Sequence, residues 1–177
     1  SPWVNNLFND KRVEIIADDA RNFLLGSTEN FDVIVGDLFT PWHAGTGSLY
    51  TIEHFNQAKK HLKKGGVFAQ WLPLYQLTPE SFEIITKTFA SVFPEVTFWR
   101  GDFSSSRASI VLIGQEKGSK LNEEILKRNI ENVIDSSKSE SDNLNDHMAG
   151  LFYLGNLNAI KNNLSNVGVN NDNYRSI

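Results

Sequence analysis

Short apolar runs alternate with helix-like segments along the first two thirds of the chain. The runs at 13–17 and 31–35 are nearly continuous in apolar side chains, which is typical of parallel strands covered on both faces. Between such runs, apolar residues recur at helical spacing. The pattern predicts strands at 13–17, 31–35, 67–72, 96–99 and 109–113, and helices at 20–25, 51–64 and 78–93.

Two of the expected helices carry boundary signals. Thr78 is placed to cap the last of them, and Pro79 follows at the first helical position, where a missing N–H does no harm. Gly65 and Gly66 are expected to end the helix at 51–64. The alternation of strands and helices, closed by two strands in succession, predicts an α/β fold. We expect a Rossmann-like, mostly parallel sheet with an antiparallel edge strand.

The last third of the chain has a different character. Residues 121–134 fit an amphipathic helix, and the following Ser-, Asp- and Glu-rich stretch is expected to be mobile near 135–146. A last helix or two is expected within 147–164. We therefore divide the chain into an α/β domain at 1–118 and a C-terminal helical extension at 119–177.

Composition narrows the classes of function. The 177 residues include 17 Lys and Arg against 21 Asp and Glu, a formal net charge of -4, so no nucleic-acid partner is expected. The absence of Cys excludes a disulfide framework, a thiolate metal site and a Cys nucleophile. No run approaches the roughly 18–20 apolar residues of a membrane span. The four His lack metal-ligand spacing, so no metal is expected.

Acidic residues follow two of the expected strands, at the edge where open α/β sheets bind ligands. Asp18 and Asp19 come after the first strand, and Asp37 comes after the second. Such carboxylates can accept hydrogen bonds from an adenine amine, a ribose hydroxyl or a substrate ammonium. The spacing alone slightly favours a simpler interpretation, in which Asp19 caps the next helix and Asp37 begins a turn.

Five parts of the sequence form a familiar set: 18–24, 31–37, Pro41, 49–51 and 62–66. Together they resemble the spermidine synthase, or polyamine aminopropyltransferase, family. The match extends from about Val13 to Gly114 and implies the fold of class I S-adenosylmethionine-dependent methyltransferases. The tail at 147–177 resembles the close of spermidine-synthase-like domains that are fused to membrane segments.

The resemblance implies transfer of an aminopropyl group from decarboxylated S-adenosylmethionine to a diamine such as putrescine. It implies that Asp37 orients the attacking amine and takes its proton. It also implies that Asp19 accepts from the adenine amine, beside Asp18, and that the N–H of Ala20 donates to a ring nitrogen. On the substrate side it implies roles for Thr40, Gln70, Tyr75 and Phe103.

Several positions depart from the family pattern. Thr40 stands where the family has a second Asp that grips the polyamine, Phe103 stands where a Tyr is common, and Ala20 replaces a usual Gly. Loss of a charge-assisted partner costs about 1.5–3 kcal/mol, although the nearby Asp102 could replace it in part. Two alternatives therefore stay open: S-adenosylmethionine-dependent methyl transfer, or a non-catalytic domain that binds an adenosyl compound or a partner protein.

The chain begins just before the strand that the family counts as its third. By resemblance, a Gly-rich cofactor loop and a ribose-binding acid would come earlier, so we expect an N-terminally truncated domain without its first two strands. This chain alone is then expected to bind the cofactor poorly and to be inactive. A homodimer, a strand swap or a rearranged strand is expected to cover the open sheet edge. We expect a cytoplasmic-facing domain, and leave membrane attachment of the full-length protein open.

Overall fold

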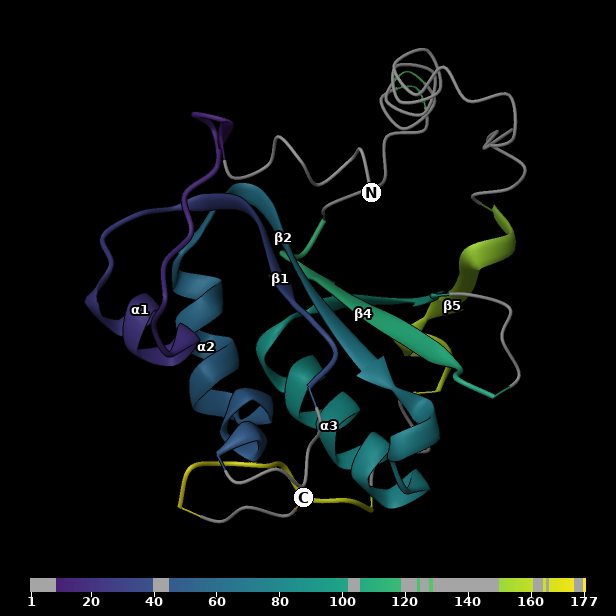
Figure 1. The fold of residues 1–177 in the computed structure, drawn as a ribbon. Coiled ribbons are helices and arrows are strands. Elements are labelled where there is room, and N and C mark those ends of the chain that lie inside the picture. The colour runs from purple at the N-terminus through teal and green to yellow at the C-terminus, as the bar shows by residue number, and fades with distance from the viewer. Residues whose placement is uncertain are drawn as a thin grey trace.

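The computed structural model describes residues 9–39, 45–101, 106–118, 124, 128, 150–160, 164, 166–173 and 177. A five-stranded sheet has the order β1-β2-β4-β3-β5, and α1, α2 and α3 pack against one of its faces (Figure 1). The strands are β1 Phe31–Gly36, β2 Leu62–Pro73, β3 Glu95–Arg100, β4 Ser109–Gln115 and β5 Tyr153–Asn156. The helices are α1 Ala20–Gly26, α2 Ile52–Lys60 and α3 Pro79–Val92, with 3₁₀ turns η2 Thr46–Tyr50, η3 Leu74–Gln76 and η4 Leu157–Ala159.

The sheet is mixed, and not mostly parallel as the sequence predicted, because three of its four described strand pairs are antiparallel. β1 runs parallel to β2, whereas β4 lies between β2 and β3 and is antiparallel to both. The α/β class is therefore confirmed. The closing strand β4 lies inside the sheet, because it can pair directly with β3 on one side and with β2 on the other. The edge beside β3 is formed by β5, which is also antiparallel.

The expectation of helix throughout 147–164 is wrong for its central part. Residues 150–152 are helical, but β5 follows and pairs with β3. The edge of β3 presents backbone groups that another strand can satisfy, and this pairing overrides the helical spacing of the sequence. The helix expected at 121–134, apart from helical positions 124 and 128, and the stretch near 135–146 lie outside the described residues.

The strand expected at 13–17 does not form. Ile15 and Ile16 are 63% and 50% exposed, and no strand pairs with this segment in the described part of the chain. A lone extended segment leaves its backbone groups to water, so its apolar sequence is not enough to make a strand. The expectation that both faces of β1 are covered fails for a related reason. Val33 and Val35 alternate with the core residue Ile34 and are 55% and 58% exposed, since no described element covers them.

The boundary between α2 and β2 also differs from the expectation of a helix to residue 64. α2 ends at Lys60, and β2 begins at Leu62, which pairs with Phe31. The register then jumps, since Val33 pairs with Val67, so residues 63–66 form a bulge. Gly65 in this bulge has φ of 80°, a conformation that side chains disfavour. The two glycines therefore shape a bulged strand instead of ending a helix.

The core is a cluster of aromatic rings between the sheet and the helices. Phe55 of α2, Phe68 of β2 and Phe89 of α3 lie with ring centroids 5.1–5.9 Å apart, and Phe93 is 4.7 Å from Phe89. All four are buried. Gly114 of β4 lies directly against this cluster, because a Cβ there would approach Phe93 Cγ to 2.5 Å. The rings therefore occupy the space that a side chain at residue 114 would need.

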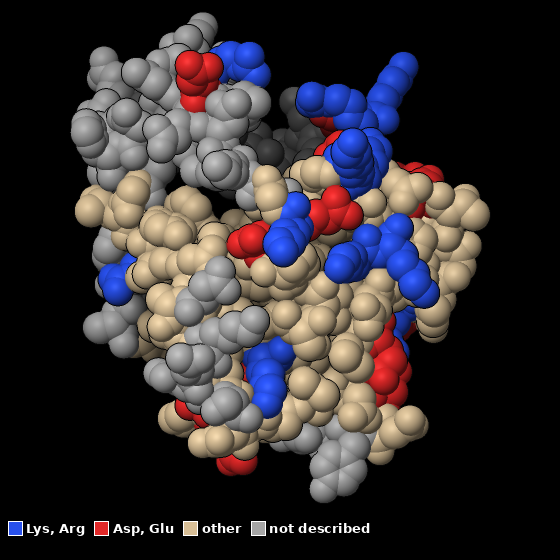
Figure 2. Space-filling view, turned by 180° about the vertical axis from the view of Figure 1, so that it is seen from behind, with Lys and Arg blue, Asp and Glu red and all other residues tan. Residues whose placement is uncertain are grey.

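Charged side chains of both signs lie on the face drawn in Figure 2, where Lys and Arg lie beside Asp and Glu and the rest of the coloured surface is formed by other residues. The ion pair of Lys63 with Asp32, at 2.8 Å, is exposed, and exposed pairs contribute little to stability. This surface ion pair therefore contributes less to stability than the aromatic core does. No helix in the described ranges is both long enough and apolar enough to cross a membrane.

Gly114→Ala is expected to lower the free energy of unfolding by about 1–3 kcal/mol, because the added methyl overfills the aromatic cluster. Urea denaturation followed by circular dichroism measures the change. Gly168→Ala is the matched control, since a Cβ at Gly168 meets nothing within 4 Å. Equal losses in the two variants would contradict the tight contact at residue 114.

Candidate functional site

The candidate site lies beyond the carboxyl ends of β1 and β2. These strands are parallel and Gly36 pairs with Gln70, so Asp37 and the turn after β2 leave the sheet at the same edge. Tyr75 belongs to η3 in that turn and is exposed. Thr40, Phe103 and Asp102 lie outside the described residues.

Asp19 is the N-cap of α1, as the simpler interpretation held. Its Oδ1 accepts hydrogen bonds from the backbone N–H groups of Arg21 and Asn22, at 2.9 and 3.1 Å. The neighbouring Asp18 accepts from the backbone N–H of Asp19 at 2.7 Å. Because both cap bonds use Oδ1, Oδ2 is the atom of Asp19 that a ligand amine would meet. Asp18, Asp19 and Ala20 are exposed, and their contact with a ligand stays a prediction.

Asp37 directly follows β1 and is exposed, and no turn is assigned to residues 37–39, so the simpler interpretation that it begins a turn stays a prediction. Its Oδ1 accepts from the N–H of Leu38 at 2.7 Å. Two residues on, the carbonyl of Phe39 accepts a hydrogen bond of 3.0 Å from the hydroxyl of the buried Tyr50. Burial raises the pKa of Tyr50, so its hydroxyl keeps the proton that it donates. The main chain on both sides of Asp37 is therefore fixed while its carboxylate faces solvent.

Gln70 supports Asp37 from the neighbouring strand. Its side chain is fully buried, and Nε2 donates to the carbonyls of Trp71 (3.1 Å), Gly36 (3.4 Å) and Asp37 (3.5 Å). A Cβ at Gly36 would lie 2.5 Å from Oε1 of Gln70, so Gly36 leaves room for this amide. The described contacts of Gln70 are to the backbone, and its expected contact with a substrate stays a prediction.

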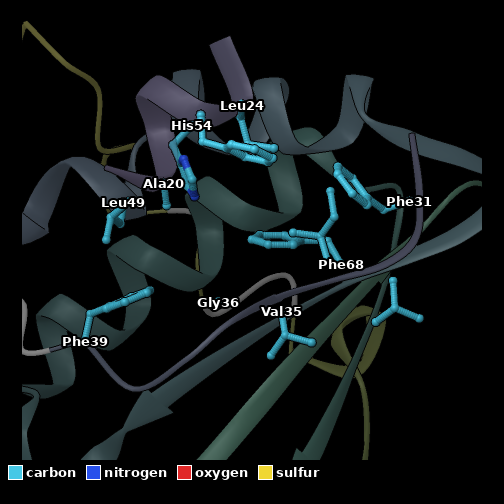
Figure 3. A pocket seen from close by; sticks show the side chains of 12 residues that line it. Ala20, Leu24, Phe31, Val35, Gly36, Phe39, Leu49, His54 and Phe68 are labelled. Carbon is cyan, nitrogen blue, oxygen red and sulfur yellow. The ribbon is translucent and has the colours of Figure 1, made fainter. Parts of the chain in front are cut away.

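A cavity of about 240 Å³ opens between α1, β1 and α2 (Figure 3). Ala20, which follows Asp19, and Gly36, which precedes Asp37, both line it, so the two candidate acids lie beside one cavity. Pockets for whole small-molecule ligands are typically about 300–1,000 Å³, so this one suits part of a ligand. The remaining lining is apolar except for His54: Phe23, Leu24, Phe31, Val33, Ile34, Val35, Phe39, Leu49 and Phe68.

His54 of α2 is the polar side chain among these lining residues. It is 6% exposed, and its Nδ1 has no hydrogen-bond partner. Burial lowers the pKa of His54 to about 4, with a further lowering by Arg21 that Asp19 and Asp172 oppose. The imidazole is therefore neutral near pH 7. Sequence reasoning missed His54, because a single His on an apolar helix face is typical of a core residue.

The sequence model of the spermine/spermidine synthase domain matches residues 2–100, more than half of the chain. The chain belongs to the spermine/spermidine synthase family. The polyamine aminopropyltransferase of Aeropyrum pernix is 38% identical over 97 residues, covering 53% of this chain and 31% of the relative. Polyamine aminopropyltransferase 2 of Hyperthermus butylicus is 28% identical over 92 residues, covering 51% and 30%.

Solved spermidine synthases share the fold. One, in complex with the transition state analogue AdoDATO, gives a TM-score of 0.69 at 20% identity, and the likeness covers 87% of this chain and 52% of that one. The spermidine synthase of Thermotoga maritima gives 0.65 at 19% identity, with 87% and 50% covered. This spermine/spermidine synthase domain therefore spans about half of those structures, and about 30% of the length of the two curated relatives.

Stability at acid pH is expected to depend on His54. Its folded pKa of about 4 lies below the ordinary value of 6.5, so the unfolded chain takes up the proton first as the pH falls. The contribution of His54 to the free energy of unfolding is therefore fully present above pH 6.5. As the pH falls from 6.5 through about 4, this contribution is lost, by on the order of 3 kcal/mol. Urea unfolding at pH 7 and pH 4.5 measures this loss.

His54→Phe is the matched variant, because it removes the titrating ring and the unpartnered nitrogen while it keeps an aromatic side chain. It should lose less stability over the same pH interval than the unchanged protein, since the carboxylates titrate in both. An identical loss would contradict a buried neutral imidazole.

Proposed function

We propose that this domain takes part in aminopropyl transfer from decarboxylated S-adenosylmethionine to a diamine such as putrescine. The observation that carries the proposal is that the residues next to Asp19 and Asp37 line one cavity, in a chain that belongs to the spermine/spermidine synthase family. Its relatives, which are polyamine aminopropyltransferases, support the same reaction. No metal enters the proposal.

Asp37 would act on the acceptor amine. In this reaction the amine nitrogen forms a bond to the carbon beside the sulfonium, the C–S bond breaks, and methylthioadenosine leaves with the electron pair. The nitrogen must first be neutral and in line, so a carboxylate that orients it and accepts its proton lowers the barrier. Asp37 suits this task because its side chain is exposed while Gln70 and Tyr50 fix the backbone around it.

The opposite side of the cavity would bind the adenosyl group. Asp19 offers Oδ2 to the adenine amine, beside Asp18, and the N–H of Ala20 lies at the start of α1, where helix N–H groups point outward. The apolar lining with Phe39 and Leu49 suits a flat ring. The neutral His54 adds no charge to this lining.

The acceptor side of the proposed site departs from the family pattern, because Thr40 stands where that pattern has an acid. The proposal assigns Thr40, Gln70, Tyr75 and Phe103 to the acceptor side. The substitution at Thr40 favours, as the second candidate, methyl transfer from S-adenosylmethionine to a non-polyamine acceptor. A third candidate is a non-catalytic domain that binds an adenosyl compound or a partner protein.

We also propose that the site is completed outside these 177 residues. The chain spans about 30% of its curated relatives, so on its own it would bind decarboxylated S-adenosylmethionine weakly and turn over little. The exposed Val33 and Val35 of β1 support a homodimer or a swapped strand that covers this edge. The tail supports the membrane-fused branch of the family, with this domain facing the cytoplasm.

The test is product analysis with Asp37→Asn in the longest polypeptide that contains this chain. Putrescine and decarboxylated S-adenosylmethionine are supplied, and methylthioadenosine is measured by mass spectrometry. The variant is expected to lose about 10²–10⁴-fold in kcat, the usual contribution of a general base, while calorimetry shows retained methylthioadenosine binding. Asp32→Asn, an exposed acid on the same strand, is the control and should keep its activity.

Other outcomes decide between the candidates. Formation of S-adenosylhomocysteine from S-adenosylmethionine, without methylthioadenosine, would replace aminopropyl transfer with methyl transfer. Failure of the polypeptide to bind any adenosyl compound would leave the non-catalytic domain.

A further inference from the structure

Residues 166–173 return from the end of the sequence to the start of α2. In Figure 1 this yellow segment passes below α2 and α3. Asn170, within it, is fully buried. Its backbone N–H donates to Thr88 Oγ1 of α3 at 2.8 Å, and its carbonyl accepts from the N–H of Ile52 at 3.0 Å. The segment therefore satisfies one of the unpaired N–H groups in the first turn of α2.

The side chain of Asn170 holds the turn that precedes α2. Nδ2 donates to the carbonyls of Gly47 and Tyr50, at 3.3 and 3.2 Å, which are both in η2. Tyr50 in turn donates from its hydroxyl to the carbonyl of Phe39. A continuous chain of contacts therefore runs from the C-terminal segment to the main chain two residues after Asp37.

Asp172 of the same segment reaches the other side of the cavity. Its carboxylate accepts two hydrogen bonds from Arg21, at 2.9 and 2.6 Å, and Arg21 also donates to the carbonyl of Ser48 in η2. The backbone N–H of Asp172 donates to Glu53 of α2 at 3.1 Å. Arg21 is the second residue of α1 and directly follows Ala20, which lines the cavity.

We infer that residues 166–173, the C-terminal clasp, set the relative positions of the two acidic sides of the cavity, with Asn170 and Asp172 as positioning residues. Asn170 acts on Asp37 through Tyr50 and Phe39, and Asp172 acts on Asp19 through Arg21. Each contact joins residues 82–151 positions apart in the sequence, so the clasp ties together elements that neighbouring residues do not connect. The inference rests on the proposed function only for the roles of Asp19 and Asp37.

Hydrogen exchange in the 177-residue chain tests the clasp without a ligand. Asn170→Ala is expected to speed amide exchange at residues 45–52 by about tenfold to a hundredfold, because buried carbonyls lose their donor. Exchange in β2 and β4 should stay unchanged. Asn173→Ala is the matched control in the same segment, since its side chain is exposed, and it should alter neither region. Asp172→Asn, at a partly exposed ion pair, leaves the core intact and should speed exchange in α1.

A second measurement separates positioning from general stability. The ¹³C resonances of the Asp19 and Asp37 carboxyl groups are expected to shift in Asn170→Ala and Asp172→Asn. They should not shift in Val96→Ala, which removes core packing from β3 instead of from α3, the helix that Asn170 contacts. Unchanged exchange at 45–52, uniformly faster exchange throughout the sheet, or equal carboxyl shifts in Val96→Ala would each overturn the inference. Because neither experiment uses a ligand, their results do not depend on whether the protein catalyses aminopropyl transfer.

Discussion

The contact between the Gln70 amide and the backbone at the end of β1 is the constraint on which the candidate site depends. Gln70 lies opposite Gly36 in the parallel pair, and its amide fills the space that a side chain at residue 36 would take. One buried amide thereby donates to the carbonyls of both Gly36 and Asp37. These hydrogen bonds from Gln70 fix the end of β1. The Asp37 carboxylate can therefore be exposed and still have a defined position.

The rest of the site is arranged around this fixed strand end. The hydroxyl of Tyr50 in η2 donates a hydrogen bond to the carbonyl of Phe39. The clasp is bonded to η2 through Asn170 and to α1 through Asp172. Each hydrogen bond contributes only about 0.5–1.5 kcal/mol, but together they connect the end of β1, η2 and the start of α1. The apolar cavity lies between these supports. Hydrogen-bonded polar groups therefore surround the cavity, whereas the cavity itself is lined by apolar side chains and the neutral His54.

Local signals in the sequence predicted the parts that depend on local physics. The strand that precedes Asp37, the caps Asp19 and Thr78, and the helix that begins at Pro79 all form as expected. The parts that failed depend on distant partners: 13–17 finds no neighbouring strand, and β5 forms because the edge of β3 is open. The burial of His54 and Asn170 follows from contacts across the fold, which periodicity along one helix or tail does not encode.

A double-mutant cycle between Gly36 and Gln70 tests the central constraint most directly. Urea unfolding is measured for Gly36→Ala, Gln70→Ala and the double variant. Gly36→Ala should cost about 1–3 kcal/mol by overpacking, and Gln70→Ala should also destabilise because backbone carbonyls lose their donor. If the amide and the added methyl compete for one space, the double variant loses less than the sum of the single losses by more than about 1 kcal/mol. Losses that add to within about 0.5 kcal/mol would show that the two residues act independently and would contradict the account.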